Sequence, residues 1–208
     1  SVAAPVLVVG NLTVGGTGKT PLVCWLVQAL RERGWKPGIA TRGYGGEEGR
    51  ARLVGAEDAA SDVGDEAVLL ARRCQTPVAV GRRRVEAAQL LIDQGCDVIV
   101  CDDGLQHLAL RRDCEIVVID GVRGFGNGQL LPAGPLRESP QRLNEVDAVV
   151  VNGGAIATGD SRLPMRLEGD TAVQLRGGER RLLSEWAGQS VHAVARLGHP
   201  QRFFTALR

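Results

Sequence analysis

The stretch that decides the fold is "VGNLTVGGTGKTPLVCWL", residues 9–26. An apolar run, "PVLVVG" (5–10), leads into it, and an amphipathic run, "TPLVCWLVQALRERG" (20–34), follows. A buried strand, a glycine-rich turn and a helix that begins at Gly-Lys-Thr are the context that a phosphate-binding loop (P-loop) requires. The usual pattern opens with glycine, whereas this chain has Thr13 there. The anion-binding part comes after that position, so the sequence still predicts a nucleotide site.

Each residue type in the loop has a chemical task. Gly15, Gly16 and Gly18 let backbone N–H groups converge on phosphate oxygens without interference from a Cβ atom. Lys19 is expected to bridge the β- and γ-phosphates, and the Thr20 hydroxyl is expected to ligate Mg²⁺. The predicted ATP-binding residues are Thr13, Val14, Gly15, Gly16, Thr17, Gly18, Lys19 and Thr20.

A second part of such a site is a carboxylate at the end of another strand, which organises Mg²⁺. In "CDVIVCDDG" (96–104), Asp102 and Asp103 follow an apolar run. They should emerge at the carboxyl edge of the sheet, where ligands of open α/β sheets bind. We expect one of them to coordinate the metal and the other to support the metal or position water, although two adjacent acids also suit a solvated turn.

Short β-branched runs alternate with amphipathic stretches, which is typical of a parallel sheet covered by helices. Strands are expected over 5–10, 36–43, 76–81, 96–104, 114–121 and 146–154, and helices over 20–34, 64–74 and 83–95. The polar segment 46–63 is expected to be an irregular loop. The predicted fold class is therefore α/β and P-loop NTPase-like, with a mostly parallel sheet flanked by helices.

The pattern changes after residue 154. Residues 161–188 are expected to form short antiparallel strands with a Gly-Gly turn, and "VHAVARLG" (191–198) a buried strand before a final helix begins. We therefore expect a P-loop core over 1–154, followed by a small β-rich appendage and the start of a C-terminal subdomain over 155–208. The chain starts almost at a strand, without Met, and stops within a helical pattern, so we expect a fragment truncated at both ends.

The composition limits the possible partners. The 208 residues carry a net charge of +1, and only 3% are aromatic, which argues against a nucleic-acid partner. Five cysteines without ligand spacing are expected to be reduced thiols. No apolar run approaches the ~20 residues that a membrane span needs. We expect this fragment alone to be soluble, and the protein to be a monomer.

Seven motifs occur in order along the whole chain: "VGNLTVGGTGKTP", "TRGYGG", "DVGDE", "VGRRRVEAA", "DDGLQH", "GFGNGQLLPAGPLRE" and "GHPQRFF". Together they resemble the tetraacyldisaccharide 4′-kinase family of Gram-negative bacteria. The resemblance implies transfer of the γ-phosphate of ATP, with Mg²⁺, to the 4′-hydroxyl of a tetraacylated disaccharide 1-phosphate in lipid A biosynthesis. It also implies that the full-length protein contacts the cytoplasmic face of the inner membrane peripherally.

The resemblance adds functional residues to those of the P-loop. Asp65, in "GDE", is the candidate catalytic base, and it also suits a helix N-terminus as an acid that favours the dipole. Lys19 and Asp103 complete the expected catalytic set. The expected contacts of the phosphorylated sugar acceptor are Arg42, Arg84, Gln106, His107, Asn127 and Glu138.

The chain also departs from the family's pattern. Ala67, Leu105 and Arg196 stand where the family usually has proline, phenylalanine and glycine. The resemblance further implies a C-terminal histidine that works with the catalytic aspartate, and an N-terminal amphipathic membrane segment. We expect both to lie outside this fragment, and we therefore expect the fragment to bind nucleotide and to turn over poorly.

Two other classes share the P-loop. An ATP-dependent ligase of the dethiobiotin synthetase type has the same Gly-Gly-Thr-Gly-Lys-Thr loop, but it acts on small carboxylates and does not need "LLPAGPLRE" (130–138). A non-enzymatic nucleotide switch should carry an Asn-Lys-x-Asp element that reads guanine. "VVNGG" (150–154) lacks that element, which favours adenine.

Overall fold

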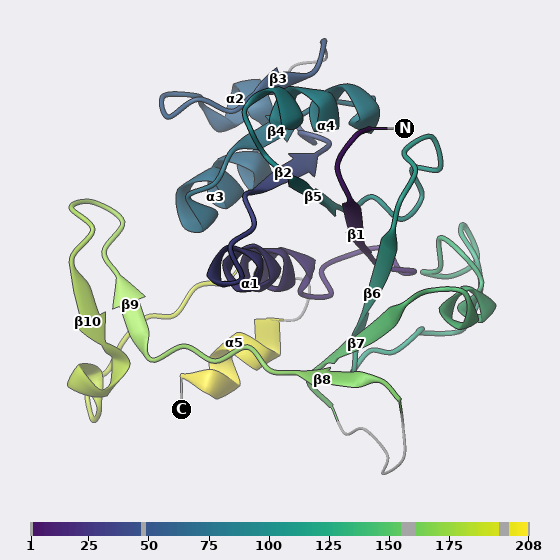
Figure 1. Ribbon diagram of the computed structural model, residues 1–208. Coiled ribbons are helices and arrows are strands. Elements are labelled where there is room, and N and C mark those ends of the chain that lie inside the picture. The colour runs from purple at the N-terminus through teal and green to yellow at the C-terminus, as the bar shows by residue number, and fades with distance from the viewer. Residues whose placement is uncertain (1, 47–48, 155–160, 196–199, 208) are drawn as a thin grey trace. The chain divides into compact units, whose positions relative to one another are not determined.

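The structure is a computed structural model that describes residues 2–46, 49–154, 161–195 and 200–207 (Figure 1). The chain divides into two compact units, Ser1–Met165 and Arg166–Arg208. None of the helices in the described part of the chain is long and apolar enough to cross a bilayer.

The first unit contains an eight-stranded sheet in the order β3-β4-β2-β5-β1-β6-β7-β8. The pairing of β3 with β4 is antiparallel, and the other neighbouring strands are parallel. Its elements are β1 (Val6–Gly10), α1 (Lys19–Glu32), β2 (Pro37–Thr41), β3 (Arg52–Leu53), α2 (Ala60–Val63), α3 (Asp65–Cys74), β4 (Val78–Val80), α4 (Arg84–Asp93), β5 (Val98–Asp102), β6 (Cys114–Asp120), the 3₁₀ helix η1 (Pro140–Asn144), β7 (Ala148–Asn152) and β8 (Leu163–Met165). The predicted α/β class with a mostly parallel sheet is confirmed.

Helices cover both faces of this sheet (Figure 1). Alternate residues of β5 show the arrangement, since successive side chains of a strand point to opposite faces. Ile99 and Cys101 pack in the cluster that includes Leu91 of α4. Val100 packs in the cluster that includes Val23 of α1 and residues of α3. The central strands of the sheet are buried on both faces, and this is why their sequences are almost continuously apolar.

The parallel strands end at one edge of the sheet, and this alignment gathers the loops that carry the site. β1 and β5 are neighbours with Val9 opposite Asp102, so the glycine-rich loop and the acidic pair leave the sheet side by side. Thr41 of β2 lies opposite Val80 of β4, so the segments that begin with Arg42 and Gly81 emerge together.

The predicted elements of this unit are found with boundaries shifted by a few residues. Residues 46–63, expected to be an irregular loop, contain two short elements, β3 and α2. β3 has two residues and α2 has four, and both are too short for a periodic pattern to be recognised.

The sheet extends beyond residue 154, which differs from the expected division of the chain. Strand β8 (Leu163–Met165) pairs in parallel with β7, and the first compact unit ends at Met165. Residues 161–188 were expected to contain only antiparallel strands. The difference arises because β8 has three residues with a proline at its centre, so neither its length nor its composition indicates a sheet strand.

The second unit contains the predicted hairpin and helix. β9 (Thr171–Val173) and β10 (Arg180–Leu182) pair in antiparallel fashion, and Gly177 and Gly178 turn the chain with positive φ. The 3₁₀ helix η2 (Leu183–Trp186) and α5 (Pro200–Ala206) follow. The prediction of a buried strand over 191–198 is wrong for residues 191–195, which have no regular structure and are mostly exposed. Residues 196–198 lie outside the described residues. No described strand pairs with 191–195, and β-branched residues alone do not form a strand.

Candidate functional site

The loop between β1 and α1 has the backbone shape of an anion-binding turn. Gly15 and Gly18 have φ of 93° and 96°, in the left-handed region that favours glycine. Gly18 immediately precedes the first residue of α1. A Cβ atom on Gly18 would lie 2.4 Å from Nδ2 of Asn152, which donates a hydrogen bond of 3.0 Å to the carbonyl oxygen of Thr17. Gly18 is therefore required both by its conformation and by the close approach of β7.

Residues from a later part of the chain form hydrogen bonds to the backbone of the loop. The backbone N–H of Val14 donates to the carbonyl oxygen of Pro135 at 2.8 Å, and that of Arg137 donates to the carbonyl oxygen of Leu12 at 2.6 Å. The side chain of Arg123 donates to the carbonyl oxygen of Val14 at 3.2 Å. Contacts within the protein thus hold the glycine-rich turn in shape.

Replacement of Gly18 by alanine tests this description. We expect Gly18→Ala to lower the free energy of unfolding by about 2–3 kcal/mol, because a left-handed backbone strains alanine and the added methyl group displaces Asn152. Gly16→Ala is the matched control, since nothing lies within 4 Å of a Cβ atom there. Urea denaturation of the two variants gives the comparison, and equal stability would contradict the assignment.

Asp102, the last residue of β5, is a buried carboxylate without a side-chain partner. Its exposed fraction is 0%, and no side chain in the described part of the chain donates a hydrogen bond to either oxygen. Burial raises the pKa of Asp102 to about 8; the charges of Glu66 and Asp103 add to this effect, and that of Lys19 opposes it. An unsatisfied buried carboxylate of this kind suits a cation.

Asp103, in contrast to Asp102, has charged partners and a lowered pKa. Its backbone is left-handed, with φ of 49°, and its Oδ1 lies 3.4 Å from Nζ of Lys19 and 3.0 Å from Nη1 of Arg137. Burial acts to raise the pKa of Asp103, but the charges of Lys19 and Arg137 outweigh it, so the pKa lies below its usual value. The acidic pair therefore combines a carboxyl that burial tends to neutralise with one that is charged and ion-paired.

The residues present fit a magnesium ion held together with a phosphorylated ligand. The Thr20 hydroxyl, at the start of α1, donates to Oε1 of Glu66 at 3.0 Å, and the charge of Glu66 acts in turn on Asp102. Within the described ranges, no three His, Cys, Asp or Glu side chains gather closely enough to hold a metal by themselves. Mg²⁺ characteristically takes only one or two protein carboxylates and completes its shell with phosphates and water.

A cavity of about 670 Å³ opens beside the acidic pair. Five of the predicted site residues line it: Arg42, Arg84, Asp103, Gln106 and His107. The other lining residues, which the sequence patterns did not single out, are Thr41, Tyr44, Glu66, Arg82 and Arg137. Most of its charged side chains are arginines, so the cavity suits an anionic ligand.

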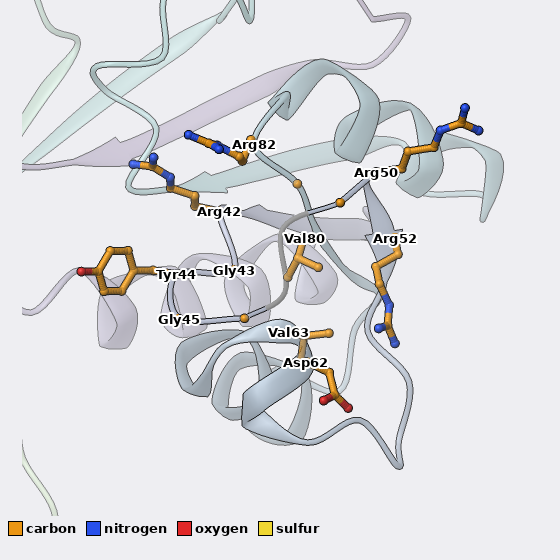
Figure 2. A pocket seen from close by; sticks show the side chains of 13 residues that line it. Arg42, Gly43, Tyr44, Gly45, Arg50, Arg52, Asp62, Val63, Val80 and Arg82 are labelled. Atoms are coloured by element: carbon orange, nitrogen blue, oxygen red, sulfur yellow. The ribbon is translucent and has the colours of Figure 1, made fainter.

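A second cavity, of about 330 Å³, shares Arg42, Tyr44 and Arg82 with the first (Figure 2). Arg42 and Arg82 follow the neighbouring strands β2 and β4, and both side chains line both cavities. Arg50 and Arg52 also line it, and Arg52 forms an ion pair with Asp58. The cationic surface therefore continues away from the glycine-rich loop along this edge of the sheet.

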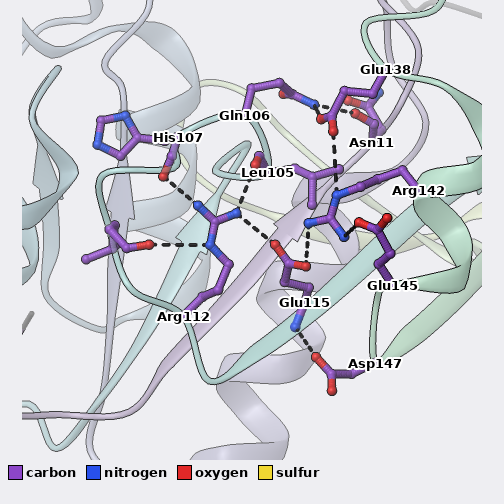
Figure 3. Close-up of polar contacts among 11 residues, drawn as sticks. Asn11, Leu105, Gln106, His107, Arg112, Glu115, Glu138, Arg142, Glu145 and Asp147 are labelled. Carbon is purple, nitrogen blue, oxygen red and sulfur yellow. Dashed lines mark hydrogen bonds and ion pairs between the residues drawn. The ribbon is translucent and has the colours of Figure 1, made fainter.

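A partly buried ionic network fixes the turn that carries Gln106 and His107 (Figure 3). Arg112 donates to the carbonyl oxygens of Leu105 and His107 at 2.9 and 2.6 Å, and to Oε1 of Glu115 at 2.8 Å. The other carboxylate oxygen of Glu115 accepts from Arg142 at 2.5 Å. Glu115 on β6 therefore binds two arginines, of which Arg112 holds the turn directly.

The same network reaches Glu138. Arg142 lies 3.6 Å from Oε2 of Glu138, whose Oε1 accepts a hydrogen bond of 2.7 Å from Gln106. Gln106 also accepts from Arg137 at 3.2 Å. The two predicted residues Gln106 and Glu138 are thus joined directly by a hydrogen bond.

His107 lies on the same turn. Burial, followed by the charges of nearby arginines, lowers the pKa of His107, which favours the neutral imidazole.

Three further residues of the predicted site are Asp65 and Asn127, which do not line the large cavity, and Arg84, which lines it but is buried. Asp65, the first residue of α3, is exposed, does not line the large cavity, and its Oδ1 accepts from its neighbour's backbone N–H at 2.8 Å. Asn127 is engaged within its own loop, where Nδ2 donates to the carbonyl oxygen of Ala133 at 2.9 Å. Arg84 lines the cavity but is buried, and its Nη1 donates to the carbonyl oxygen of Gly81 at 2.7 Å.

Two interacting residues were missed by the sequence patterns. Glu66 adjoins Asp65 in "GDE", and the choice between the two acids needs the position of Thr20. Arg137 adjoins Glu138 in "GPLRE" (134–138), but its partner Asp103 lies 34 positions away in sequence. No local pattern predicts a pairing over such a separation.

The fold and the loop geometry together define a protein of the P-loop NTPase-like class. The family model described as tetraacyldisaccharide-1-P 4′-kinase matches residues 1–208, and the chain belongs to this family.

Relatives and a solved structure agree with this membership. The chain is 54% identical to the tetraacyldisaccharide 4′-kinase of Methylobacillus flagellatus over 99% of its length, and 54% identical to that of Stenotrophomonas maltophilia over 98%. It spans 62% of the length of either relative. The crystal structure of LpxK from Aquifex aeolicus in complex with ATP superposes with a TM-score of 0.80 at 27% identity, covering 99% of this chain and 67% of that one.

Proposed function

We propose that the full-length protein is an ATP-dependent kinase that transfers the γ-phosphate to the 4′-hydroxyl of a tetraacyldisaccharide 1-phosphate. The names of the relatives and the ATP complex of LpxK support this proposal. The observation that carries it is the cluster of Lys19, Asp103 and Arg137 between a glycine-rich loop and a cation-lined cavity. A phosphoryl donor and an anionic acceptor could meet there.

In this proposal residues 13–20 bind ATP. The backbone N–H groups of the loop and the N-terminus of α1 bind phosphate oxygens, and Lys19 neutralises charge on the transferred group. Thr20, Asp102 and Asp103 are the residues that would hold Mg²⁺, which supplies charge neutralisation to the phosphates. Since Asp103 is engaged with Lys19 and Arg137, whereas Asp102 has no side-chain partner among the described residues, we assign the closer metal contact to Asp102.

The acceptor is proposed to lie in the large cavity. Its phosphate would contact arginines of the lining, of which Arg42 is exposed and Arg84 is buried. Gln106 and His107 would contact sugar hydroxyls, and Glu138 would hold Gln106 in place. Asn127, whose side chain bonds within its own loop, would act on the acceptor through the shape of that loop.

Asp65 is proposed as the base that accepts the proton of the 4′-hydroxyl. We expect Asp65→Asn to lower kcat by roughly 10²–10⁴-fold, because general-base catalysis contributes about that factor. The affinity for Mg-ATP should be unchanged, since Asp65 does not touch the glycine-rich loop in the described contacts. Isothermal titration with a non-hydrolysable ATP analogue, beside steady-state kinetics, separates the two effects.

Glu66→Gln is the matched control for this variant. It should weaken metal-nucleotide binding, since Glu66 accepts the hydrogen bond of the Thr20 hydroxyl, which is proposed to ligate the metal. If Asp65→Asn abolished ATP binding and Glu66→Gln removed only turnover, the roles of the two acids would be exchanged.

The proposed acceptor also determines partners and location. Its acyl chains reside in a lipid phase, so we propose that the full-length protein contacts the cytoplasmic face of the bacterial inner membrane peripherally, as a monomer and without a nucleic-acid partner. Co-sedimentation of the full-length protein with vesicles tests the membrane contact.

Transfer of labelled γ-phosphate from ATP to the disaccharide 1-phosphate by the full-length protein is the decisive experiment. Formation of the 4′-phosphorylated product is the expected result. A ligand that binds only the native state raises its stability, so thermal shifts with Mg-ATP and Mg-GTP separate the kinase from a guanine-nucleotide switch. A shift with Mg-GTP and none with Mg-ATP, without product, would contradict the proposal.

A further inference from the structure

Two of the five cysteines meet between α1 and α3, and neither is among the residues that line the two cavities. The Sγ atoms of Cys24 on α1 and Cys74 at the end of α3 are 3.0 Å apart, in a contact in which Cys74 donates and Cys24 accepts. Both are free thiols. Cys74 is buried and Cys24 is partly exposed, so one sulfur of the pair can be reached from solvent.

The two thiols are electronically different. The hydrogen bond from Cys74 lowers the pKa of Cys24 to about 7, against the effect of burial and with help from the charge of Arg73. The same hydrogen bond, with burial, raises the pKa of Cys74. Cys24 therefore has the thiolate character of an attacking sulfur, and Cys74 lies in the position of a resolving thiol.

We infer that Cys24 and Cys74 form a reversible disulfide, which is an oxidation site that joins α1 to α3. With a peroxide as oxidant, the Cys24 thiolate attacks one oxygen. An S–O bond forms, the O–O bond breaks, and the departing hydroxide takes up from solvent the proton that Cys24 released on ionising, which gives water. The sulfur of Cys74 then attacks the sulfenic acid of Cys24. The S–S bond forms, the S–O bond breaks, and hydroxide takes the Cys74 proton. Two thiols and one peroxide give one disulfide and two waters.

The two helices also contact each other through their N-terminal residues. α1 begins with Lys19 and Thr20, α3 begins with Asp65 and Glu66, and Thr20 donates to Glu66 at 3.0 Å. A bond between Cys24 and Cys74 would restrict movement of one helix against the other. The oxidised protein would therefore hold the two helix N-termini in the arrangement described above.

Peptide mapping of the full-length protein tests the inference independently of kinase activity. After hydrogen peroxide, non-reducing trypsin digestion should yield residues 20–31, which contain Cys24, linked to residues 74–82, which contain Cys74. Dithiothreitol should release both peptides. Peptides that stay unlinked while Cys24 is converted to sulfinic acid would overturn the inference.

Cys114 provides the matched control. It is also partly exposed, but burial and the charges of Asp147 and Glu115 raise its pKa. At pH 7 iodoacetamide should therefore modify Cys24 several-fold faster than Cys114. Cys74→Ser should let Cys24 proceed to sulfinic acid, whereas Cys114→Ser should leave the 24–74 linkage unchanged. Equal alkylation rates, or a linkage lost in Cys114→Ser, would contradict the proposed pair.

Thermal unfolding gives a second readout. The bond would close a loop between residues 50 positions apart, so the oxidised protein should have a Tm several degrees above the reduced one. Oxidation should not raise the Tm of Cys24→Ser or Cys74→Ser. A linked protein with a lowered Tm would show that the native packing does not accommodate the bond.

Discussion

Replacement of Lys19 by alanine should lower the turnover of the proposed full-length kinase by roughly 10²–10³-fold, as the loss of one electrostatic stabiliser typically does. Lys19 opens α1 directly after the glycine-rich loop, and its Nζ lies 3.4 Å from Oδ1 of Asp103. Removal of this ammonium group leaves the transferred phosphate with less compensating charge. Steady-state assays with ATP and the disaccharide acceptor measure the effect.

Lys36→Ala is the control for this variant, because Lys36 is the other lysine of the chain and is exposed just before β2. It should retain wild-type turnover. Full activity of Lys19→Ala would contradict the proposed role of the loop, and equal losses in both variants would point to a general effect of charge.

Asp102→Asn should have two opposite effects: it should abolish Mg²⁺-dependent turnover and yet stabilise the protein in the absence of nucleotide. The pKa of Asp102 is raised from 3.8 to about 8, so the folded protein holds a proton that the unfolded chain releases near pH 4. The stability of the wild type therefore falls as pH rises from about 4 to about 8, by at most about 6 kcal/mol. Asparagine does not ionise, so the advantage of the variant should grow over that pH range.

Asp103→Asn is the control, for which we expect the opposite change in stability. The pKa of Asp103 is lowered by Lys19 and Arg137, so its contribution to stability is present above the unfolded pKa and is lost as pH falls. At neutral pH this variant should therefore be less stable than the wild type. Tm measured across the pH range without nucleotide compares the two variants. If Asp102→Asn were destabilising at pH 8, the carboxyl would have a partner that offsets its burial.

The sequence predicts the centre of the site because its parts are local. The glycine-rich loop, Lys19 and the Asp102–Asp103 pair each lie at the end of an apolar run, and parallel strands bring such ends to one edge. Gln106 and His107 follow the acidic pair closely in sequence and line the same cavity. The α/β class follows from the same alternation of strands and helices.

The remaining parts depend on contacts over long sequence separations. Arg137 pairs with Asp103 through a loop that folds back across the sheet edge, and Glu66 comes to Thr20 because α3 packs against α1. Strand β8 is recognised only from its pairing with β7. Conversely, residues 191–195 have the composition of a strand but no described partner, so composition alone gives the wrong structure there.

The backbone bonds from Val14 to Pro135 and from Arg137 to Leu12 make the glycine-rich turn and the neighbouring loop one mechanical unit. Arg137 also lines the cavity proposed for the acceptor. Occupancy of that cavity and occupancy of the turn are then thermodynamically linked: any change that one ligand makes in the affinity for the other is returned by the same factor. The protein would thereby favour the complex with both ligands over either complex with one ligand, whenever both ligands prefer the same arrangement of these two loops.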